Sequence, residues 1–336
     1  MQICIVGAGA IGGLMATRLA CAGNDVTVID RDAHLAAIRS EGLTLVEMDG
    51  SKTVAHVRAV EHATDVGAQD LVILAVKSQV LEEIAPSLAP LTGPDTIYLT
   101  VQNGLPWWYF HKHGGPFDRY RIASLDPGGR LTHHIDSDRI IGCVVYPAAT
   151  IVEPGVIRHV EGDRFPIGEL DGSTTPRIKR LARTFDAAGL EARILGDIRS
   201  EIWLKAWGNL SFNPISALTH ATLADIARFP ETRSLVAAMM SEAQAVAARL
   251  GITFRHTIDK RIAGAEAVGA HKTSMLQDVE AGRTLETEAL IGSIIELARM
   301  TGTPSPSIDA VYACTRLLNT VMIGEGAGIR LVRRAA

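Results

Sequence analysis

The stretch MQICIVGAGAIGGLMATRLACAGNDVTVIDRD, residues 1–32, decides the fold of this 336-residue chain. A short β-type run leads into a glycine cluster, a helix-like segment and a second β-type run that ends at an acidic residue. Gly7, Gly9 and Gly12 form the pattern G-x-G-x-x-G directly after the first run. In this pattern the first glycine permits a tight turn, the second admits a pyrophosphate to the backbone, and the third lets the helix pack closely on the strand. The stretch therefore predicts a dinucleotide-binding unit rather than a merely structural turn.

The end of this stretch carries two residues that favour different dinucleotides. Asp30 closes the second β-type run, where a carboxylate accepts hydrogen bonds from the ribose hydroxyls and selects NAD. Arg31 follows it, and an arginine at this place accommodates the 2′-phosphate of NADP. A carboxylate repels a nearby phosphate, and an arginine can instead stack on the adenine. The sequence thus predicts an NAD(P)H site at which Asp30 slightly favours NADH.

Composition excludes several classes of function. The chain is 47% hydrophobic with a net charge of −4, and its charges are interspersed, so nucleic-acid binding is not expected. No apolar run approaches the ~18 residues of a membrane span, and a cytoplasmic protein is expected. The four cysteines lack metal-ligand spacing and are expected to be small buried hydrophobes, with neither metal nor disulfide; they are Cys4, Cys21, Cys143 and Cys314.

The order of apolar patterns predicts two domains. Up to about residue 140, short β-type runs alternate with helical stretches, which is typical of a mostly parallel Rossmann-type sheet. Between residues 140 and 170 extended segments separated by the turn EPG are expected to finish that sheet in antiparallel fashion. From residue 197 only helical periodicity follows. We expect a dinucleotide-binding domain over 1–196 and a helical substrate and dimerisation domain over 197–336.

One helical segment carries an unusual polar stripe. Lys205, Asn209 and Asn213 are spaced i, i+4 and i+8, so they share one face of a helix that Pro214 is expected to end. Buried polar groups are costly without partners, which makes the stripe a candidate site. From the pattern alone, a solvated lysine with two capping asparagines is an equally simple interpretation.

Five motifs together resemble the ketopantoate reductase (2-dehydropantoate 2-reductase) family over nearly the whole chain. They are GAGAIGG at 7–13, AVKS with Lys77, QNG with Asn103, the KxxxNxxxNP run at 205–214, and SMLQDVEAGRTLETE with Ser274 and Glu286. The last two are the specific ones. The resemblance implies an NAD(P)H-dependent reductase that transfers hydride to the ketone of a 2-oxo acid.

The resemblance also implies roles for individual residues. Lys205 matches the catalytic lysine, which can polarise the carbonyl and supply the proton. Asn103 matches an asparagine that contacts nicotinamide and substrate, and Lys77 matches a lysine near the cofactor. Glu286 matches the carboxylate that binds the substrate hydroxyl. The positions that match substrate binding are Asn209, Asn213 and Ser274.

Several of these residues have simpler structural interpretations. Ser274 could cap the helix that begins at MLQD. Glu286 and Glu288 are two apart, so on a helix only one of them can face a cleft. The remaining polar and aromatic candidates are interpreted as surface charges (Asp278, Arg283), as packing residues (Trp203, Trp207) or as unassigned histidines (His133, His134, His271).

The chain departs from the family pattern in one long segment. Residues 105–140, rich in aromatic side chains, form a longer connection than compact family members have, and such a segment beside a strand end can reshape a substrate pocket. The expected substrate is therefore 2-dehydropantoate or a different, bulkier 2-oxo acid or ketone. An opine-type dehydrogenase and a non-catalytic dinucleotide sensor are the alternatives. A homodimer through the helical domain is expected.

Overall fold

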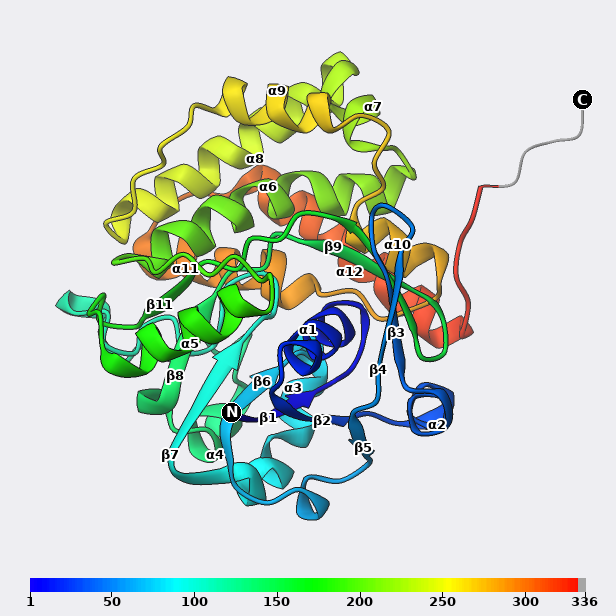
Figure 1. The fold of residues 1–336 in the computed structure, drawn as a ribbon. Helices are drawn as coiled ribbons and strands as arrows, with labels where there is room; N and C mark the ends of the chain where they lie inside the picture. Colours follow the sequence, from blue (N-terminus) through cyan, green and yellow to red (C-terminus); the bar gives the residue numbers. More distant parts are fainter. Residues whose placement is uncertain (332–336) are drawn as a thin grey trace, which may run out of the picture. The chain divides into compact units, whose positions relative to one another are not determined.

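The computed structural model describes residues 1–331, which form two compact units (Figure 1). The first comprises Met1–Arg121 and Asp126–Ile198, and the second comprises Ile122–Leu125 and the chain from Arg199 onward. The sequence places the division at residue 196. The last five residues of the expected helical domain, 332–336, lie outside the described part.

The first unit is built on a seven-stranded sheet with the order β11-β8-β7-β6-β1-β2-β5. All neighbouring strands run parallel except β11, which is antiparallel to β8. This arrangement confirms the predicted mostly parallel Rossmann-type sheet. The strands are β1 (Gln2–Val6), β2 (Asp25–Ile29), β5 (Arg58–Val60), β6 (Gln69–Leu74), β7 (Thr92–Thr100), β8 (Ile140–Cys143) and β11 (Ile167–Glu169).

A second sheet of four strands, in the order β4-β3-β10-β9, completes this unit. The expectation that the extended segments between residues 140 and 170 finish the main sheet in antiparallel fashion is confirmed only for β11. It is wrong for β8, which is parallel to β7, and for β9 and β10, which pair with each other while β10 also pairs with β3. Instead of extending the main sheet, β9 and β10 pack against helix α1 (Ala10–Cys21). The strands are β3 (Leu43–Val46), β4 (Lys52–Ala55), β9 (Ala148–Glu153) and β10 (Val156–Glu161).

Helix α1 (Ala10–Cys21) lies between the two sheets (Figure 1), in contact with β1 and β2 and with all four strands of the second sheet. Burial on both sides explains its nearly continuous apolar sequence. Within the helix, Gly13 lets Ile157 of β10 approach, since a Cβ on Gly13 would lie 2.7 Å from the Ile157 Cγ1. The other helices of this unit are α2 (Asp32–Glu41), α3 (Ser78–Ile84), α4 (Arg130–His134), α5 (Pro176–Ala187) and the short η1 (Ala63–Asp65), η2 (Ala85–Leu91), η3 (Gly115–Phe117), η4 (Pro127–Gly129) and η5 (Ser137–Arg139).

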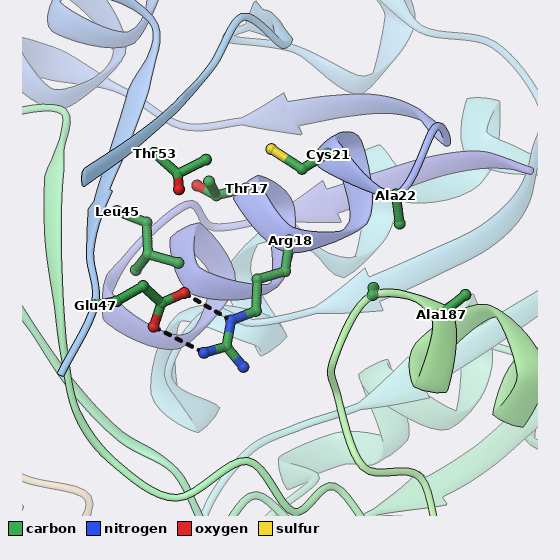
Figure 2. A pocket seen from close by; sticks show the side chains of 9 residues that line it. Thr17, Arg18, Cys21, Ala22, Leu45, Glu47, Thr53 and Ala187 are labelled. Atoms are coloured by element: carbon green, nitrogen blue, oxygen red, sulfur yellow. Dashed lines mark hydrogen bonds and ion pairs between the residues drawn. The ribbon is translucent and has the colours of Figure 1, made fainter. Parts of the chain in front are cut away.

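An ion-pair network fixes the C-terminal half of α1 to the second sheet. The Arg18 guanidinium donates to both carboxylate oxygens of Glu47, at 3.2 and 2.8 Å (Figure 2). It also forms an ion pair with Asp163. The side chain of His159 is fully buried, and its Nδ1 lies 2.8 Å from Glu47 Oε2, one of the two oxygens that Arg18 contacts. Burial alone would raise the pKa of Glu47, but hydrogen bonds from Arg18 and His159 lower it below its ordinary value.

Four consecutive aromatic residues of the 105–140 segment are buried, whereas Tyr120 is exposed. Trp107, Trp108, Tyr109 and Phe110 are at most 6% exposed, and the Trp108 indole donates to the Thr100 hydroxyl at 3.0 Å. Further along, the segment contributes Ile122–Leu125 to the second unit, where the Glu296 carboxylate accepts from two of its backbone N–H groups. The aromatic residues thus extend a hydrophobic core.

The second unit is helical, as the periodicity predicts. Its π-helical turn η6 (Glu288–Gly292) is the one irregular element that the sequence pattern did not indicate. The other helices are α6 (Ile198–Thr219), α7 (Leu223–Arg228), α8 (Pro230–Arg249), α9 (Ile258–Val268), α10 (Ser274–Glu280), α11 (Ser293–Thr301) and α12 (Pro306–Glu325). Over residues 1–331, no helix is long and apolar enough to cross a membrane.

The cysteines are free, but the expectation that all four are buried is wrong. Cys4 and Cys143 lie in strands and are buried, whereas Cys21 and Cys314 lie on helices and are exposed. Burial raises the pKa of the Cys4 thiol to about 12, so it is a neutral hydrophobe at physiological pH. Cys21 is the last residue of α1, where the helix emerges from between the sheets.

The Glu47 network predicts a stability contribution that depends on pH. Because its folded pKa is depressed, ionised Glu47 stabilises the fold above its ordinary pKa, and this contribution is lost as the pH falls through the folded value. We expect Glu47→Gln to lower the free energy of unfolding by about 1–3 kcal/mol at pH 7. In urea denaturation, the difference from wild type should shrink between pH 5 and pH 3. The exposed Glu61→Gln is the control, and a difference that is constant with pH would contradict the assignment.

Candidate active site

The glycine loop between β1 and α1 leaves no room for side chains at two of its three glycines. Gly7 adopts φ +96°, and a Cβ there would lie 2.8 Å from the Val76 Cγ1. A Cβ placed on Gly12 would overlap the carbonyl oxygen of Gly7. Strand β1 and helix α1 therefore meet through their backbones, which is the close strand–helix packing that the glycine pattern predicts.

Gly9 differs from the other two glycines. It is the N-cap residue of α1, no side chain caps the helix there, and nothing lies within 4 Å of the place its Cβ would occupy. A helix N-terminus with uncapped N–H groups and open space in front of it attracts an anion. The loop thus fits the pyrophosphate of a dinucleotide, which Gly9 would allow to approach the backbone.

Asp30 holds the glycine loop in place. Its Oδ2 accepts from the Ala8 N–H at 2.7 Å, and its Oδ1 accepts from the Arg31 N–H at 2.8 Å. The Arg31 side chain is 76% exposed and lies 3.6 Å from the Asp32 carboxylate. The sequence indicated Asp30 as a ribose ligand but gave no sign of its bond to Ala8.

Lys77 and Asn103 follow two neighbouring parallel strands, β6 and β7. Lys77 is the N-cap residue of α3, Asn103 lies in the loop after β7, and both side chains are half-buried. The Gln102 side chain links these two loops, because its Nε2 donates to the carbonyls of Leu74 and Val76 at 2.7 and 3.0 Å. The carboxyl ends of parallel strands form the ligand-binding edge of such sheets. Sequence reasoning missed Gln102, although it stands inside the QNG motif.

In the second unit, α6 carries the polar stripe. Lys205 and Asn209 are half-buried and Asn213 is 6% exposed, so the stripe is not a solvated face. The opposite side of α6 is packed: Trp207 is fully buried, stacks on Phe254 with ring centroids 4.2 Å apart, and donates to a backbone carbonyl. The interpretation of the tryptophans as packing residues is confirmed.

Pro214 does not end this helix, contrary to the sequence-based expectation. It lies inside α6, which continues to Thr219. A proline in a helix removes one backbone hydrogen bond and costs about 3 kcal/mol or more. Two apolar residues close to it in the helix, Phe212 and Ile215, are at most 3% exposed, and their burial offsets this cost. Tertiary packing therefore overrides the local propensity.

Ser274 begins α10 but does not cap it. The N-cap is Thr273, whose hydroxyl accepts from the Leu276 N–H at 3.2 Å, while Ser274 is exposed. The capping interpretation of Ser274 is therefore wrong. The surface interpretation of Asp278 is also wrong, because this carboxylate is 6% exposed and forms an ion pair with Arg283 at 2.8 Å.

The two glutamates near α11 have different surroundings. Glu286 precedes the helical segment and is half-buried. Glu288 begins η6, and both of its carboxylate oxygens accept from the Tyr312 hydroxyl at 2.8 Å. Burial and the neighbouring carboxylate raise the pKa of Tyr312 to about 12. Gly292 makes this contact possible, since a Cβ there would overlap Glu288.

Some titratable groups and one cavity lie apart from the candidate residues described above. No cluster of histidine, cysteine, aspartate and glutamate suited to a metal ion occurs among residues 1–331. His133 and His134 are exposed on α4, and His271 is half-buried in the second unit. A cavity of about 310 Å³ lies beside Arg18, Cys21 and Glu47 at the C-terminal half of α1 (Figure 2). Because the glycine loop is at the other end of α1, this cavity is not the dinucleotide site.

Comparisons with known proteins agree on one family. Residues 3–112 match the family model "Ketopantoate reductase PanE/ApbA", and residues 197–319 match "Ketopantoate reductase PanE/ApbA C terminal". The chain is 51% identical over 319 residues to a 2-dehydropantoate 2-reductase of Mesorhizobium japonicum, an alignment that covers 95% of this chain and 98% of the relative.

Solved structures give the same picture. A protein of Ralstonia solanacearum MolK2 is 40% identical with a TM-score of 0.91, over 96% of this chain and 98% of that one. A 2-dehydropantoate 2-reductase of Geobacter metallireducens is 28% identical with a TM-score of 0.82, over 94% and 99% of the two chains. A D-mandelate dehydrogenase solved with NADH and anilino(oxo)acetate shares the fold at 23% identity, with a TM-score of 0.82 over 96% and 99%.

The contrast between Gly9 and Gly12 can be tested. We expect Gly9→Ala to fold normally, because its Cβ meets open space, and to weaken dinucleotide binding at least tenfold by obstructing the pyrophosphate. Gly12→Ala should lower the melting temperature, because α1 must move away from Gly7. Circular dichroism and calorimetric titration with NADH and NADPH measure the two effects. Equal melting temperatures for both variants would contradict this prediction.

Proposed function

We propose that this chain, which belongs to the ketopantoate reductase family, reduces the ketone of 2-dehydropantoate or a closely related 2-oxo acid to the 2-hydroxy acid. It is an oxidoreductase that acts on CH–OH groups and uses NAD(P)H. The observation that supports the proposal best is the half-buried stripe of Lys205, Asn209 and Asn213 on α6, at the positions of the family motif. The reaction class follows from the family, and the roles of single residues below are our proposals.

The proposed mechanism assigns a residue to the negative charge that develops on the substrate and to the proton that neutralises it. The reduced nicotinamide supplies a hydride to the carbonyl carbon, and negative charge then develops on the carbonyl oxygen. Lys205, as an ammonium, donates a hydrogen bond to that oxygen and delivers the proton. Asn103 orients the reacting groups from the loop after β7, and Lys77 acts near the cofactor from the start of α3.

The remaining residues hold the substrate. We propose that the amides of Asn209 and Asn213 and the Ser274 hydroxyl donate hydrogen bonds to it, and that the Glu286 carboxylate accepts one from its hydroxyl. We assign no such role to Glu288, because its carboxylate is directed at the Tyr312 hydroxyl of α12. The fold itself leaves the substrate open, since a D-mandelate dehydrogenase shares it. For this reason the substrate proposal includes 2-oxo acids other than 2-dehydropantoate.

The proposed reaction is tested with a panel of 2-oxo acids that includes 2-dehydropantoate, by loss of nicotinamide absorbance. We expect the highest kcat/KM for 2-dehydropantoate or a close analogue, and Lys205→Ala should lower kcat by about 10²-fold or more, the usual scale for a positioned proton donor. The dinucleotide Kd should change little. Lys260→Ala, at an exposed lysine of α9, is the matched control. Near-normal kcat in Lys205→Ala would refute the role of this lysine, and an inactive wild type would favour a sensor.

We further propose that the enzyme uses NADH at least as well as NADPH. Two carboxylates, Asp30 and Asp32, flank Arg31, and Asp32 is within 3.6 Å of its guanidinium, so the positive charge available to a 2′-phosphate is partly offset. Asp30 is also fixed at the glycine loop by its bond to Ala8, which keeps its negative charge beside the end of β2.

Removing only the charge of Asp30 tests this preference. Asp30→Asn keeps a carbonyl oxygen that can accept from Ala8, so the loop is retained while repulsion of the phosphate is lost. We expect kcat/KM to shift toward NADPH by about tenfold, which corresponds to about 1.4 kcal/mol. Arg31→Ala should shift it in the opposite direction. A wild-type enzyme that prefers NADPH a hundredfold would show that Arg31 decides the choice.

We also propose a homodimer formed through α12. Exposed residues recur along this helix at spacings of four, three and four, which is the pattern of a helix-packing seam; they are Ala310, Cys314, Leu317 and Val321. Leu317 and Val321 are 65% and 51% exposed. Two-fold symmetric dimers are the commonest soluble assemblies, and a self-complementary stripe suits them.

Light scattering at micromolar concentration tests the dimer. We expect the wild type to be a dimer. The double variant Leu317→Lys/Val321→Lys should be a monomer, because dimerisation would bury two lysine ammonium groups of one protomer against those of its partner, which is unfavourable. Val268→Lys, at another half-exposed apolar residue of the second unit, is the control and should remain dimeric. A monomeric wild-type protein would contradict the proposal.

A further inference from the structure

We infer that His34 is a positioning residue for the dinucleotide: it holds the glycine loop in its binding geometry from the third position of α2. The inference rests on the proposed use of a dinucleotide, and it names a residue that the family motifs do not include. His34 is half-buried, and its two ring nitrogens contact two different backbone segments of the first unit.

The first contact is with the glycine loop itself. Ala8 stands between Gly7 and Gly9 and is fully buried. Its carbonyl oxygen lies 2.9 Å from the His34 Nε2, and its N–H donates to Asp30 Oδ2 at 2.7 Å. Both backbone polar groups of Ala8 are therefore bound by side chains that follow β2. These two side-chain contacts add to the backbone bond from the Gly7 N–H to the Ile29 carbonyl, at 2.9 Å, in holding the loop.

The second contact is with the turn between β9 and β10. The Gly155 N–H donates to the His34 Nδ1 at 3.1 Å, and the Gly155 carbonyl accepts from the Thr44 N–H at 2.8 Å. Because Nδ1 accepts a hydrogen bond, the ring proton is on Nε2, which is the nitrogen that donates to Ala8. The imidazole thus connects the turn to the loop with one acceptor and one donor.

This connection matters because glycine loops are flexible. Glycine loses more conformational freedom on ordering than any other residue, so a loop that is already ordered binds its ligand at a lower entropic cost. Gly155 is itself held by the bond from the Thr44 N–H and by its place in the turn between the paired strands β9 and β10. Through its contacts with Gly155 and with the Ala8 carbonyl, His34 connects the glycine loop to this turn and restricts its motion. Its loss should weaken the binding of NADH and NADPH alike, because the 2′-phosphate is not involved.

Two conservative variants separate the contact with the loop from the contact with the turn. Glutamine places an N–H group near the position of Nε2 and can still donate to Ala8, whereas asparagine places an acceptor near the position of Nδ1 and can bind only Gly155. A positioning role therefore predicts that His34→Gln retains dinucleotide affinity and His34→Asn does not. A role limited to the stability of the turn predicts the reverse.

The experiment measures Kd for NADH and NADPH by calorimetric titration, the melting temperature by circular dichroism, and kcat and KM with the ketone substrate. For His34→Leu and His34→Asn we expect Kd to rise about tenfold for both dinucleotides with an unchanged NADH-to-NADPH ratio, while kcat at saturation changes little. His34→Gln should stay within about threefold of wild type. His62→Leu, at an exposed histidine of the same unit, is the control.

Several results would overturn the inference. They are an unchanged Kd in folded His34→Leu, recovery of affinity by asparagine but not by glutamine, and a change in the NADH-to-NADPH ratio in His34→Leu. If His34→Leu does not fold, the comparison of the glutamine and asparagine variants still decides the question. A wild-type protein that binds dinucleotide but reduces no ketone would refute the proposed reaction alone, and one that binds no dinucleotide would refute both.

Discussion

The carbonyl oxygen of Gly7 occupies the space where a side chain of residue 12 would be, and the rest of the first unit depends on this contact. It allows α1 to begin after a short loop and to pack closely against the main sheet. A helix pressed so closely on one sheet still has an apolar outer face, and the four-stranded sheet covers that face. The segments around β3, β4, β9 and β10 are therefore needed to bury α1.

Helix α1 is held at both ends, by different groups. Before its N-terminal end, the Ala8 N–H donates to the Asp30 carboxylate and the Ala8 carbonyl contacts His34, which in turn accepts from the Gly155 N–H, while no side chain caps the helix. At its C-terminal half, Arg18 forms charge-assisted hydrogen bonds with Glu47, directly after β3. The Arg18 network thus holds the helix on the second sheet, while the cap at its other end, which an anion would approach, stays open.

Local signals in the sequence were sufficient for strands β1, β2, β6 and β7 of the main sheet, but not for β3, β4 and β5 between them. The glycine spacing, the alternation of strands and helices and the acidic residue after β2 each indicate structure within a window of about 30 residues. The assignment of β9 and β10 to a second sheet could not be predicted this way, because it depends on β3, about 100 positions earlier in the chain. Similarly, the continuation of α6 past Pro214 depends on burial, and the ion pair of Asp278 depends on a fold that places a surface-type residue inside.

In the candidate site, too, a motif identifies residues, but the surrounding structure determines what each of them contacts. The motif SMLQDVEAGRTLETE identifies both Glu286 and Glu288 as acidic residues near the site, but it does not say which one is available. The structure distinguishes them through a π-helical turn, which adds a residue to the turn and points Glu288 at α12. Gly292 gives the Glu288 carboxylate room beside this turn, since a Cβ there would meet its Oε2. One backbone irregularity and one glycine thus accompany the bond of Glu288 to Tyr312, a pairing across two helical segments that the motif does not indicate.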